Sequence, residues 1–293
     1  MAETLNLDSE LIRGFEPKRP SDGHKNTFGQ ALICAGSEYM TGAAVLACGA
    51  ALRSGAGLVK VFSEDKTLNA VSCNEPCALL EARPASTAEL LKKATALCDK
   101  SDAVLIGPGI PADFKDMEAL TEVFLSRAKN VVLDAGALTG KPDVLSRLTE
   151  SFKSRDIPAV ITPHMGEFAR MLRLEASEVS VNAEELALKF AIENNVVVVL
   201  KSAKTIIATP DGRLFVNDAA NSGLAKGGSG DVLAGLLTGL LAQGMEPYKA
   251  ACAAVFIHSK SGESAAAELG ERYMLPEDLI VYLPDGYLEA GWR

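Results

Sequence analysis

Short runs of apolar residues, separated by longer helical patterns, constrain the fold of this chain more than any other feature of its sequence. Several of the runs are apolar throughout instead of alternating with polar residues, which is typical of strands buried on both faces. The runs are Gln30–Gly36, Leu58–Phe62, Ala103–Gly107, Val131–Ala135, Ala159–Thr162 and Val196–Lys201. Helices on both sides of a sheet bury such strands, so the pattern predicts an α/β fold, a three-layer α/β/α sandwich with a mainly parallel central sheet.

Helical patterns between these runs supply the crossovers that parallel strands require. They cover Gly42–Arg53, Thr87–Cys98, Asp113–Ala128 and Asn182–Asn194. After the last buried run, "TIIAT" and "RLFVN" flank the turn signal "PDG", which predicts a hairpin. The chain then closes with helices expected from Asp231, over Pro247–Leu269 and near Pro276–Tyr282. Because no internal repeat or linker is visible, we expect an N-terminal extension over residues 1–22 and a single domain over residues 23–293.

The acidic composition of the chain limits its partners. Its 293 residues have a formal net charge of -9 and a pI near 5.0, so long-range repulsion opposes binding to nucleic acid or anionic lipid. An anionic ligand must therefore meet lysines, backbone amides or a metal ion within its own site. The first residues do not form a basic segment followed by an apolar core, and no apolar run reaches the ~20 residues that cross a bilayer, so we expect a cytoplasmic protein.

A glycine turn that contains one carboxylate, "AKGGSGDVLAG" (residues 225–235), opens the helix expected at Asp231. It is not a Walker A loop, because its lysine precedes the glycines, and it is not a dinucleotide fingerprint, because a third glycine is missing. Gly227, Gly228 and Gly230 leave room for backbone amides to approach an anion, and the positive end of the helix points toward it. The turn therefore predicts an anion hole for a phosphate.

Asp231 has two interpretations in this turn. In the first it only caps the helix, because aspartate is a favoured N-cap residue. In the second it is a general base, which accepts the proton of a hydroxyl that attacks a phosphorus atom held by the glycine amides. A carboxylate beside a polyphosphate raises the energy of both groups unless it takes part in the chemistry or a cation intervenes. We therefore favour the base.

The order of several motifs resembles a known family. The motifs "HKNTFGQALICAGS", "IGPG", "VLDAGAL", "ITPHMGEFARM", "VVVLKSAKT" and "NSGLAKGGSGDVLAGLLTG" follow one another as in the ADP/ATP-dependent NAD(P)H-hydrate dehydratases, which have a ribokinase-like fold. The resemblance runs from about His24 to the C-terminal helices. It implies a repair reaction, in which the terminal phosphate of ADP or ATP moves to the hydroxyl of S-epimer hydrated NADH or NADPH. Elimination of phosphate then restores the reduced nicotinamide.

The resemblance also implies roles for particular residues. The catalytic base would be Asp231. The hydrated dinucleotide would be contacted by Ala44, Gly109, His164 and Asp231. The phosphoryl donor would be bound by Lys201, Ser202, Ala203, Lys204, Thr205, Gly228 and Gly230. By residue type alone, Ala44 fits helix packing, His164 fits a local hydrogen bond at a helix start, and Lys201 fits a solvated strand end.

Magnesium and protein partners are implied in the same way. Glu167, in the first turn after "TPHMG", suits a helix N-terminus on electrostatic grounds, and the resemblance adds a role in holding Mg²⁺ through water. It further suggests ADP as the favoured donor, a homotetramer, and a separate protein that supplies epimerisation in the same pathway. Met165 and Ser202 replace the proline and glycine usual in the family, which leaves the local geometry at both positions open.

Two other functions compete with the repair reaction. A ribokinase-like kinase of a small vitamin-precursor alcohol, of the hydroxymethylpyrimidine or thiazole type, would share the anion hole and the base but release a stable phosphate ester. The "HKxxFG" and "TPHxGE" stretches favour the dehydratase. A regulatory protein that binds nucleotide without turnover would gain nothing from the charge of Asp231 beside the glycines.

Overall fold

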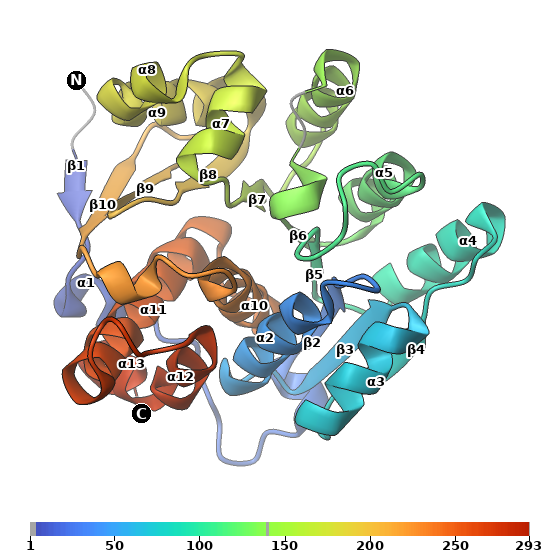
Figure 1. The fold of residues 1–293 in the computed structure, drawn as a ribbon, viewed down its shortest axis with the longest axis horizontal. Helices are drawn as coiled ribbons and strands as arrows, with labels where there is room; N and C mark the ends of the chain where they lie inside the picture. The colour runs from blue at the N-terminus through green and yellow to red at the C-terminus, as the bar shows by residue number, and fades with distance from the viewer. Residues whose placement is uncertain (1–3, 139–140, 293) are drawn as a thin grey trace.

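The computed structural model describes residues 4–138 and 141–292, which build one sheet with helices packed on both faces (Figure 1). The strands are β1 (Thr4–Asn6), β2 (Gln30–Cys34), β3 (Leu58–Ser63), β4 (Leu79–Ala82), β5 (Ala103–Ile106), β6 (Asn130–Leu133), β7 (Ala159–Ile161), β8 (Val196–Leu200), β9 (Lys204–Ala208) and β10 (Leu214–Asp218). Their order is β1-β10-β9-β8-β7-β6-β5-β2-β3-β4. Among the described strands, β9 alone runs antiparallel to its neighbours. The predicted fold, a three-layer α/β/α sandwich with a mainly parallel sheet, is confirmed.

Two hydrophobic clusters, one on each face of the sheet, divide the helices between them. The first cluster contains α1 (Ser9–Arg13), α2 (Thr41–Arg53), α3 (Asp65–Asn74), α10 (Ser229–Ala242), α11 (Pro247–Leu269), α12 (Pro276–Val281) and α13 (Leu283–Glu289). The second contains α4 (Thr87–Cys98), α5 (Met117–Arg127), α6 (Pro142–Lys153), α7 (Met165–Leu172), α8 (Ala176–Val181) and α9 (Ala183–Asn194). Successive strand residues alternate between the clusters, as Ala31 and Leu32 of β2 do, because side chains of a strand point to opposite faces. Both faces are apolar, which explains the uninterrupted apolar runs.

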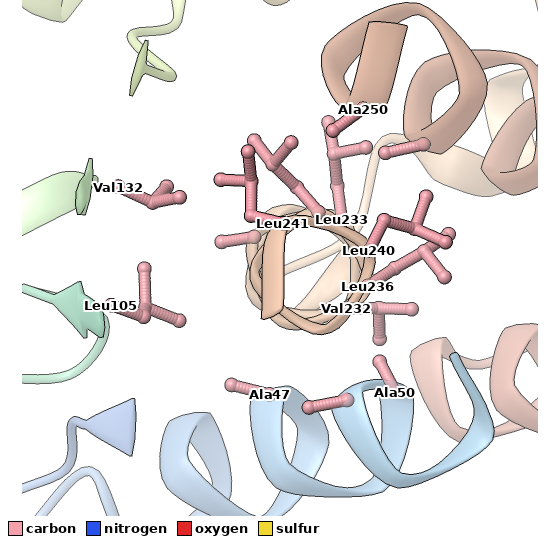
Figure 2. Packing of buried hydrophobic residues seen from close by; sticks show 14 of the residues in the cluster. Ala47, Ala50, Leu105, Val132, Val232, Leu233, Leu236, Leu240, Leu241 and Ala250 are labelled. Atoms are coloured by element: carbon pink, nitrogen blue, oxygen red, sulfur yellow. The ribbon is translucent and has the colours of Figure 1, made fainter. Parts of the chain in front are cut away.

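Helix α10 is buried on nearly every side and holds the glycine turn in place. Figure 2 shows it between the sheet, from which Leu105 and Val132 point toward it, and helix α2 with Ala47 and Ala50. The two helices lie so close that a Cβ added at Gly235 would meet the Ala47 carbonyl oxygen at 2.1 Å. A helix that is apolar all round is stable only in such surroundings. Its N-terminus is therefore fixed at one edge of the sheet.

The chain reverses its direction across the sheet between β2 and β5. From β2 it proceeds to β3 and β4 on one side, then returns to β5 on the other side and continues to β8. The loops that follow β2 and β5 diverge at this point, where α/β proteins commonly bind ligands. A hydrogen bond of 2.7 Å from the Gly36 amide to the Pro108 carbonyl joins the two loops.

Most predicted elements agree with the structure to within a few residues, and the predicted hairpin is the β9–β10 pair. Two predicted helix starts were wrong. The helix expected from Asp113 begins at Met117, because a turn forms instead, with the Phe114 amide donating to the Pro111 carbonyl. Helix α10 begins at Ser229, two residues before Asp231, and Gly228 is its N-cap. The interpretation of Asp231 as a simple N-cap is therefore wrong.

The first described residues pack on the same sheet as the rest of the chain. Strand β1 pairs with β10, and Ile12 of α1 is fully buried. The Trp292 indole donates a hydrogen bond of 2.9 Å to the Ile12 carbonyl, which links both ends of the described chain. The division of the chain between residues 22 and 23 stays a prediction. Within the described ranges, none of the helices has the length and apolar character to cross a membrane.

Candidate active site

A cavity of about 700 Å³ lies where β6, β7 and β8 end and α10 begins. Parallel strands present their carboxyl ends at the same edge of the sheet, so residues far apart in sequence meet there. Of the residues predicted for the site, the cavity is lined by His164, Glu167, Lys201, Ser202, Ala203, Thr205, Gly228, Gly230 and Asp231. The fold thus brings the predicted base, the strand-end histidine and most of the predicted nucleotide segment around one space.

A buried ion pair between Lys201 and Asp134 lines this cavity. The Lys201 Nζ lies 2.8 Å from the Asp134 Oδ1, and the same oxygen accepts a hydrogen bond of 2.8 Å from the Thr162 hydroxyl. Burial is the largest influence on the pKa of Lys201 and lowers it, but attraction by Asp134, and further by Glu167 and Asp231, raises the pKa above its ordinary value. Lys201 is therefore charged and held in one place.

Asp231 lies in the first turn of α10, close to this ion pair. Burial, and after it the negative charge of Asp134, raise the pKa of its carboxyl against the opposing positive charge of Lys201, and the net pKa is about 7. A carboxylate whose pKa lies near neutral pH is ionised at working pH and still binds a proton well, which is what a general base requires. Asp231 therefore has the electrostatic surroundings of a base.

The glycine turn before Asp231 forms the wall of the cavity. Gly228 has a φ of +109°, which favours glycine, and a Cβ there would meet the Leu46 side chain at 2.6 Å. A Cβ at Gly230 would lie 3.2 Å from the Lys201 Nζ. A Cβ at Gly227 would have no heavy atom within 4 Å among the described residues. The N-terminal amides of α10 and the lysine ammonium are thus close together. Together they form a place for a phosphate group.

His164 and Glu167 form a reciprocal cap at the start of α7. The His164 Nδ1 accepts hydrogen bonds from the Gly166 and Glu167 amides at 3.0 and 3.3 Å, and the Glu167 Oε2 accepts one from the His164 amide at 2.9 Å. With Nδ1 as acceptor, the neutral ring has its proton on Nε2. About half of the His164 side chain is exposed and its Nε2 lies 3.6 Å from the Glu167 Oε1, so this N–H is near both that carboxylate and the cavity.

Three predicted site residues do not line the cavity. The Lys204 Nζ pairs with the Glu184 Oε1 at 2.7 Å, on the side of α9. Ala44 is fully buried in α2, in agreement with its interpretation as helix packing. Gly109, with a φ of +63°, lies in the loop after β5, where a Cβ would meet the Ala43 side chain at 2.6 Å. Ala44 lies in the helix that follows the β2 loop, and Gly109 lies in the β5 loop, so both are beside the cavity rather than in it.

Sequence reasoning missed several polar residues of the cavity. Asp134 follows β6 in "VLDAGAL", and its position at a strand end was the only available signal. His258 binds the Ser229 carbonyl through Nε2 at 3.0 Å and also lines the cavity. Burial lowers the pKa of His258 to about 4, so the ring is neutral. The hydroxyls of Ser229 and Ser259 are buried there and have no hydrogen-bond partner in the described part of the chain.

Three carboxylates, those of Asp134, Glu167 and Asp231, line the same space. Across residues 4–138 and 141–292, no group of three or more His, Cys, Asp or Glu is placed to enclose a metal ion. Mg²⁺ does not need such an enclosure, because it keeps several waters and binds one or two carboxylates together with phosphate oxygens. The donor set therefore fits a magnesium ion held jointly with a phosphate ligand.

Comparison with known proteins gives consistent matches. A family model described as NAD(P)H-hydrate dehydratase matches residues 31–285. The ADP-dependent (S)-NAD(P)H-hydrate dehydratase of Bacillus subtilis is 33% identical over 94% of this chain and 95% of its own length. The crystal structure of the ADP/ATP-dependent NAD(P)H-hydrate dehydratase from Bacillus subtilis, co-crystallized with ATP/Mg²⁺, matches with a TM-score of 0.86 and 32% identity, covering 98% of each chain.

A ribokinase-like superfamily protein from Enterococcus faecalis has a TM-score of 0.79 and 27% identity, covering 96% of this chain and 94% of its own. The ribokinase-like form of the predicted fold is thus confirmed. Other curated relatives are bifunctional NAD(P)H-hydrate repair enzymes, from Moorella thermoacetica and Thermofilum pendens among others. The chain spans about half the length of these two relatives, 53% and 51%.

Proposed function

This chain belongs to the NAD(P)H-hydrate dehydratase family, and from this we propose that it dehydrates S-epimer hydrated NADH and NADPH at the expense of ADP or ATP. The observation that carries the proposal is the position of Asp231. Its carboxyl, with a pKa of about 7, lies at the start of α10 between the glycine turn and the ion pair of Lys201 with Asp134. This is an arrangement for taking a proton beside a bound phosphate.

The proposed reaction has two steps. Asp231 accepts the proton of the ring hydroxyl, whose oxygen forms a bond to the terminal phosphorus of the donor, and the bond to the leaving AMP or ADP breaks. The amides of Gly228 to Asp231 and the Lys201 ammonium stabilise the charge on the transferred group. The bond between the ring carbon and the phosphate oxygen then breaks, the neighbouring ring carbon loses a proton to water, and the double bond formed between them restores the dihydropyridine. Asp134 keeps Lys201 in position throughout.

The phosphoryl donor binds along the segment that follows β8. Lys201, Ser202, Ala203 and Thr205 line the cavity beside the glycine turn, so both ends of the predicted nucleotide site face one space. Lys204 contributes its backbone rather than its ammonium, which Glu184 holds. Glu167, with Asp134 nearby, would hold Mg²⁺ through water, and the ion would neutralise charge on the donor phosphates.

The proposal is tested by adding enzymatically hydrated NADH or NADPH with ADP or ATP and following the absorbance of the reduced nicotinamide. Recovery of the absorbance, together with release of AMP or ADP and phosphate, is the expected result. Phosphorylation of a hydroxymethylpyrimidine or thiazole alcohol without any recovery would instead identify a kinase. Binding of nucleotide without turnover of either substrate would identify a regulatory protein. Comparison of the two donors decides between ADP and ATP.

Replacement of the base gives a sharper test. Asp231→Asn keeps the shape of the side chain and the amides of the turn but cannot accept the proton, so we expect turnover to fall by about 10³-fold or more. Nucleotide affinity, measured by calorimetry, should change by less than about threefold, because the anion hole is intact. Thr205→Val, on the predicted nucleotide segment, is a matched comparison that should weaken nucleotide binding instead. Unchanged turnover in Asp231→Asn would remove it as the base.

We further propose that the protein acts in the cytoplasm as a homotetramer, alongside a separate protein that epimerises the hydrates. The names of the bifunctional relatives and the S-specific name of the Bacillus subtilis relative support the need for epimerisation. Sedimentation of the purified protein, with an expected mass of four 30.8 kDa chains, tests the oligomer. With a mixture of both hydrate epimers, the protein alone should restore the absorbance of the S fraction only. If an added epimerase makes the recovery complete, the need for an epimerase partner is supported.

A further inference from the structure

A second cavity of about 750 Å³ adjoins the first. Ala135 and Glu167 line both cavities, so the two spaces share a wall at the ends of β6 and β7. The second cavity lies on the side of Ile110, which directly follows Gly109. Gly109 is predicted to contact the hydrated dinucleotide but lies outside the first cavity. The second cavity therefore extends the proposed active site toward the loop where this substrate contact was expected.

One face of α7 connects the two cavities. His164, Glu167 and Arg170 follow one another at intervals of three residues, which places them in a row on a helix. His164 lines the first cavity, Glu167 lines both, and Arg170 lines the second. The backbone of the row rises about 9 Å along the helix axis. The Arg170 side chain turns back, since a Cβ at Gly166 would lie 3.1 Å from the His164 ring and 3.9 Å from the Arg170 Nη1. A ligand that touches His164 and follows the row meets the Arg170 guanidinium.

The charges of the two cavities differ in sign. The first is lined by three carboxylates and two lysines. Of these lysines, Lys201 is paired with Asp134, and the Lys226 ammonium donates to the carbonyls of Arg272 and Met274. The described lining of the second has two cations, Lys141 and Arg170, and a single carboxylate. Because cations outnumber carboxylates in its described lining, the second cavity attracts phosphate groups through its own side chains. In the first cavity, phosphate groups depend on backbone amides, Lys201 and a metal ion.

The wall between the cavities has a fixed shape. Ala135 has a φ of +45°, uncommon for a residue other than glycine. A Cβ at Gly107 would meet the Asp134 carbonyl oxygen at 1.8 Å, and one at Gly136 would meet the Ile110 carbonyl oxygen at 2.0 Å. The loops after β5 and β6 are thus locked against each other, and the cavities keep their relative position. A preformed site of this kind suits a long ligand of fixed geometry.

We propose that the second cavity binds the phosphate groups of the hydrated dinucleotide through Arg170 and Lys141, while His164 and Asp231 face its nicotinamide. The inference rests on the proposed function, since it extends the substrate site of the same reaction. A guanidinium binds phosphate with two parallel N–H donors, and a second cation in the same cavity reinforces the attraction. Either the pyrophosphate, common to NADH and NADPH, or the additional phosphate of NADPH supplies the anion.

The experiment measures calorimetric binding of NADPH, NADH and ADP with Mg²⁺ to the full chain and to four variants. Arg170→Gln should weaken NADPH binding by about tenfold, while Arg170→Lys, which keeps the charge, should lose less. ADP affinity should stay within about twofold in both. Lys153→Gln removes a charge from the far end of α6, outside both cavities, and serves as the matched control with unchanged affinities. Lys141→Gln provides an independent variant on another element if Arg170→Gln does not fold.

The two reduced nucleotides distinguish the sources of the phosphate. An equal loss for NADH and NADPH assigns the pyrophosphate to Arg170, and a loss for NADPH alone assigns the additional phosphate. Unchanged affinity for both in folded Arg170→Gln and Lys141→Gln, or a loss for ADP instead, would overturn the proposal. In steady state, KM for hydrated NADPH should rise by about tenfold with kcat nearly unchanged.

The binding measurement does not depend on turnover, so failure of the subsite and failure of the proposed function can be told apart. Loss of NADPH affinity in Arg170→Gln, in a protein that does not dehydrate the hydrates, would overturn the function and retain the subsite. If the protein dehydrates the hydrates but its NADPH affinity does not depend on Arg170, the function is retained and the subsite is overturned.

Discussion

Asp231 is an ionisable group in an environment that opposes its own charge. Burial, together with the negative charge of Asp134, raises its pKa from an ordinary value of 3.8 to about 7. Between these two pH values the native state binds a proton that the unfolded state has released. Native stability therefore falls as the pH rises through this window, which is the reverse of the usual effect of a salt-bridged carboxylate. The carboxylate costs stability at the pH where a base must be ionised.

Asp231→Asn should consequently stabilise the protein at high pH. We expect its free energy of unfolding at pH 8 to exceed that of the wild type by about 4 kcal/mol, because the asparagine has no charge to bury. The difference should shrink as the pH falls from about 7 to about 4, where the wild-type carboxyl is protonated. Urea unfolding at both pH values measures it. If the two proteins differ equally in free energy of unfolding at pH 8 and at about pH 4, the titration of Asp231 does not affect stability, and any pH dependence comes from another group.

Helix α10 positions Asp231, and it packs closely because two of its residues, Gly235 and Gly239, have no side chain. Gly235 and Gly239 face α2 so closely that a Cβ at Gly239 would meet the Ser54 hydroxyl at 2.0 Å. Alanines of α2 supply the opposing surface, as Figure 2 shows for Ala47 and Ala50. Small residues on both helices allow their backbones to approach. The sequence predicted a helix here, but the partner of its glycine face is set by the fold.

Gly235→Ala should destabilise the protein by about 3 kcal/mol, because the added methyl meets backbone rather than a movable side chain. Turnover should fall as well, since any shift of α10 moves Asp231 relative to Lys201. Thermal or urea unfolding, together with the dehydration assay, measures both effects. Gly42→Ala, in α2 with no heavy atom near the added methyl, is the matched control and should be neutral or slightly stabilising. Equal stability of the two variants would contradict the close packing.

At the scale of the whole molecule, the first and last described segments are held by each other. Strand β1 covers the edge of β10, Ile12 is buried among the helices of the first cluster, and the Trp292 indole binds the Ile12 carbonyl. The chain is therefore stabilised by residues that the sequence placed in an N-terminal extension. Their burial is a contact between segments about 280 residues apart, which no local pattern reveals.

Deletion of residues 1–22 should lower the free energy of unfolding by about 3 kcal/mol or more, because it exposes the surface that Ile12 covers and leaves the edge of β10 open. The single tryptophan, Trp292, is only 5% exposed, so its fluorescence reports the unfolding transition in guanidinium. Ile12→Ala should reproduce a large part of the loss, and Val281→Ala, at an exposed position, should not. An unchanged midpoint after deletion would show that the extension is independent of the domain.

Local features account for the parts of the fold and site that could be predicted. Apolar runs without alternation identified the buried parallel strands, and "PDG" identified the β9–β10 turn, because both signals depend on neighbouring residues. Strands β1 and β4 were not predicted, since their residues are mostly exposed and show no apolar run. The glycine turn and the strand-end residues gave only part of the cavity lining. Asp134 and His258 were missed, because nothing local separates them from ordinary strand-end or core residues.

The sequence by itself determined the layered α/β architecture and the glycine turn with its carboxylate, because hydropathy and backbone preference act over a few residues. The tertiary structure decided what the carboxylate can do. The pKa of Asp231 depends on burial and on Asp134 and Lys201, which β6 and β8 bring to the same edge of the sheet. The second cavity likewise exists only where α7 and the loops after β5 and β6 meet. Coulomb interactions and desolvation depend on distance in space, which sequence separation does not encode.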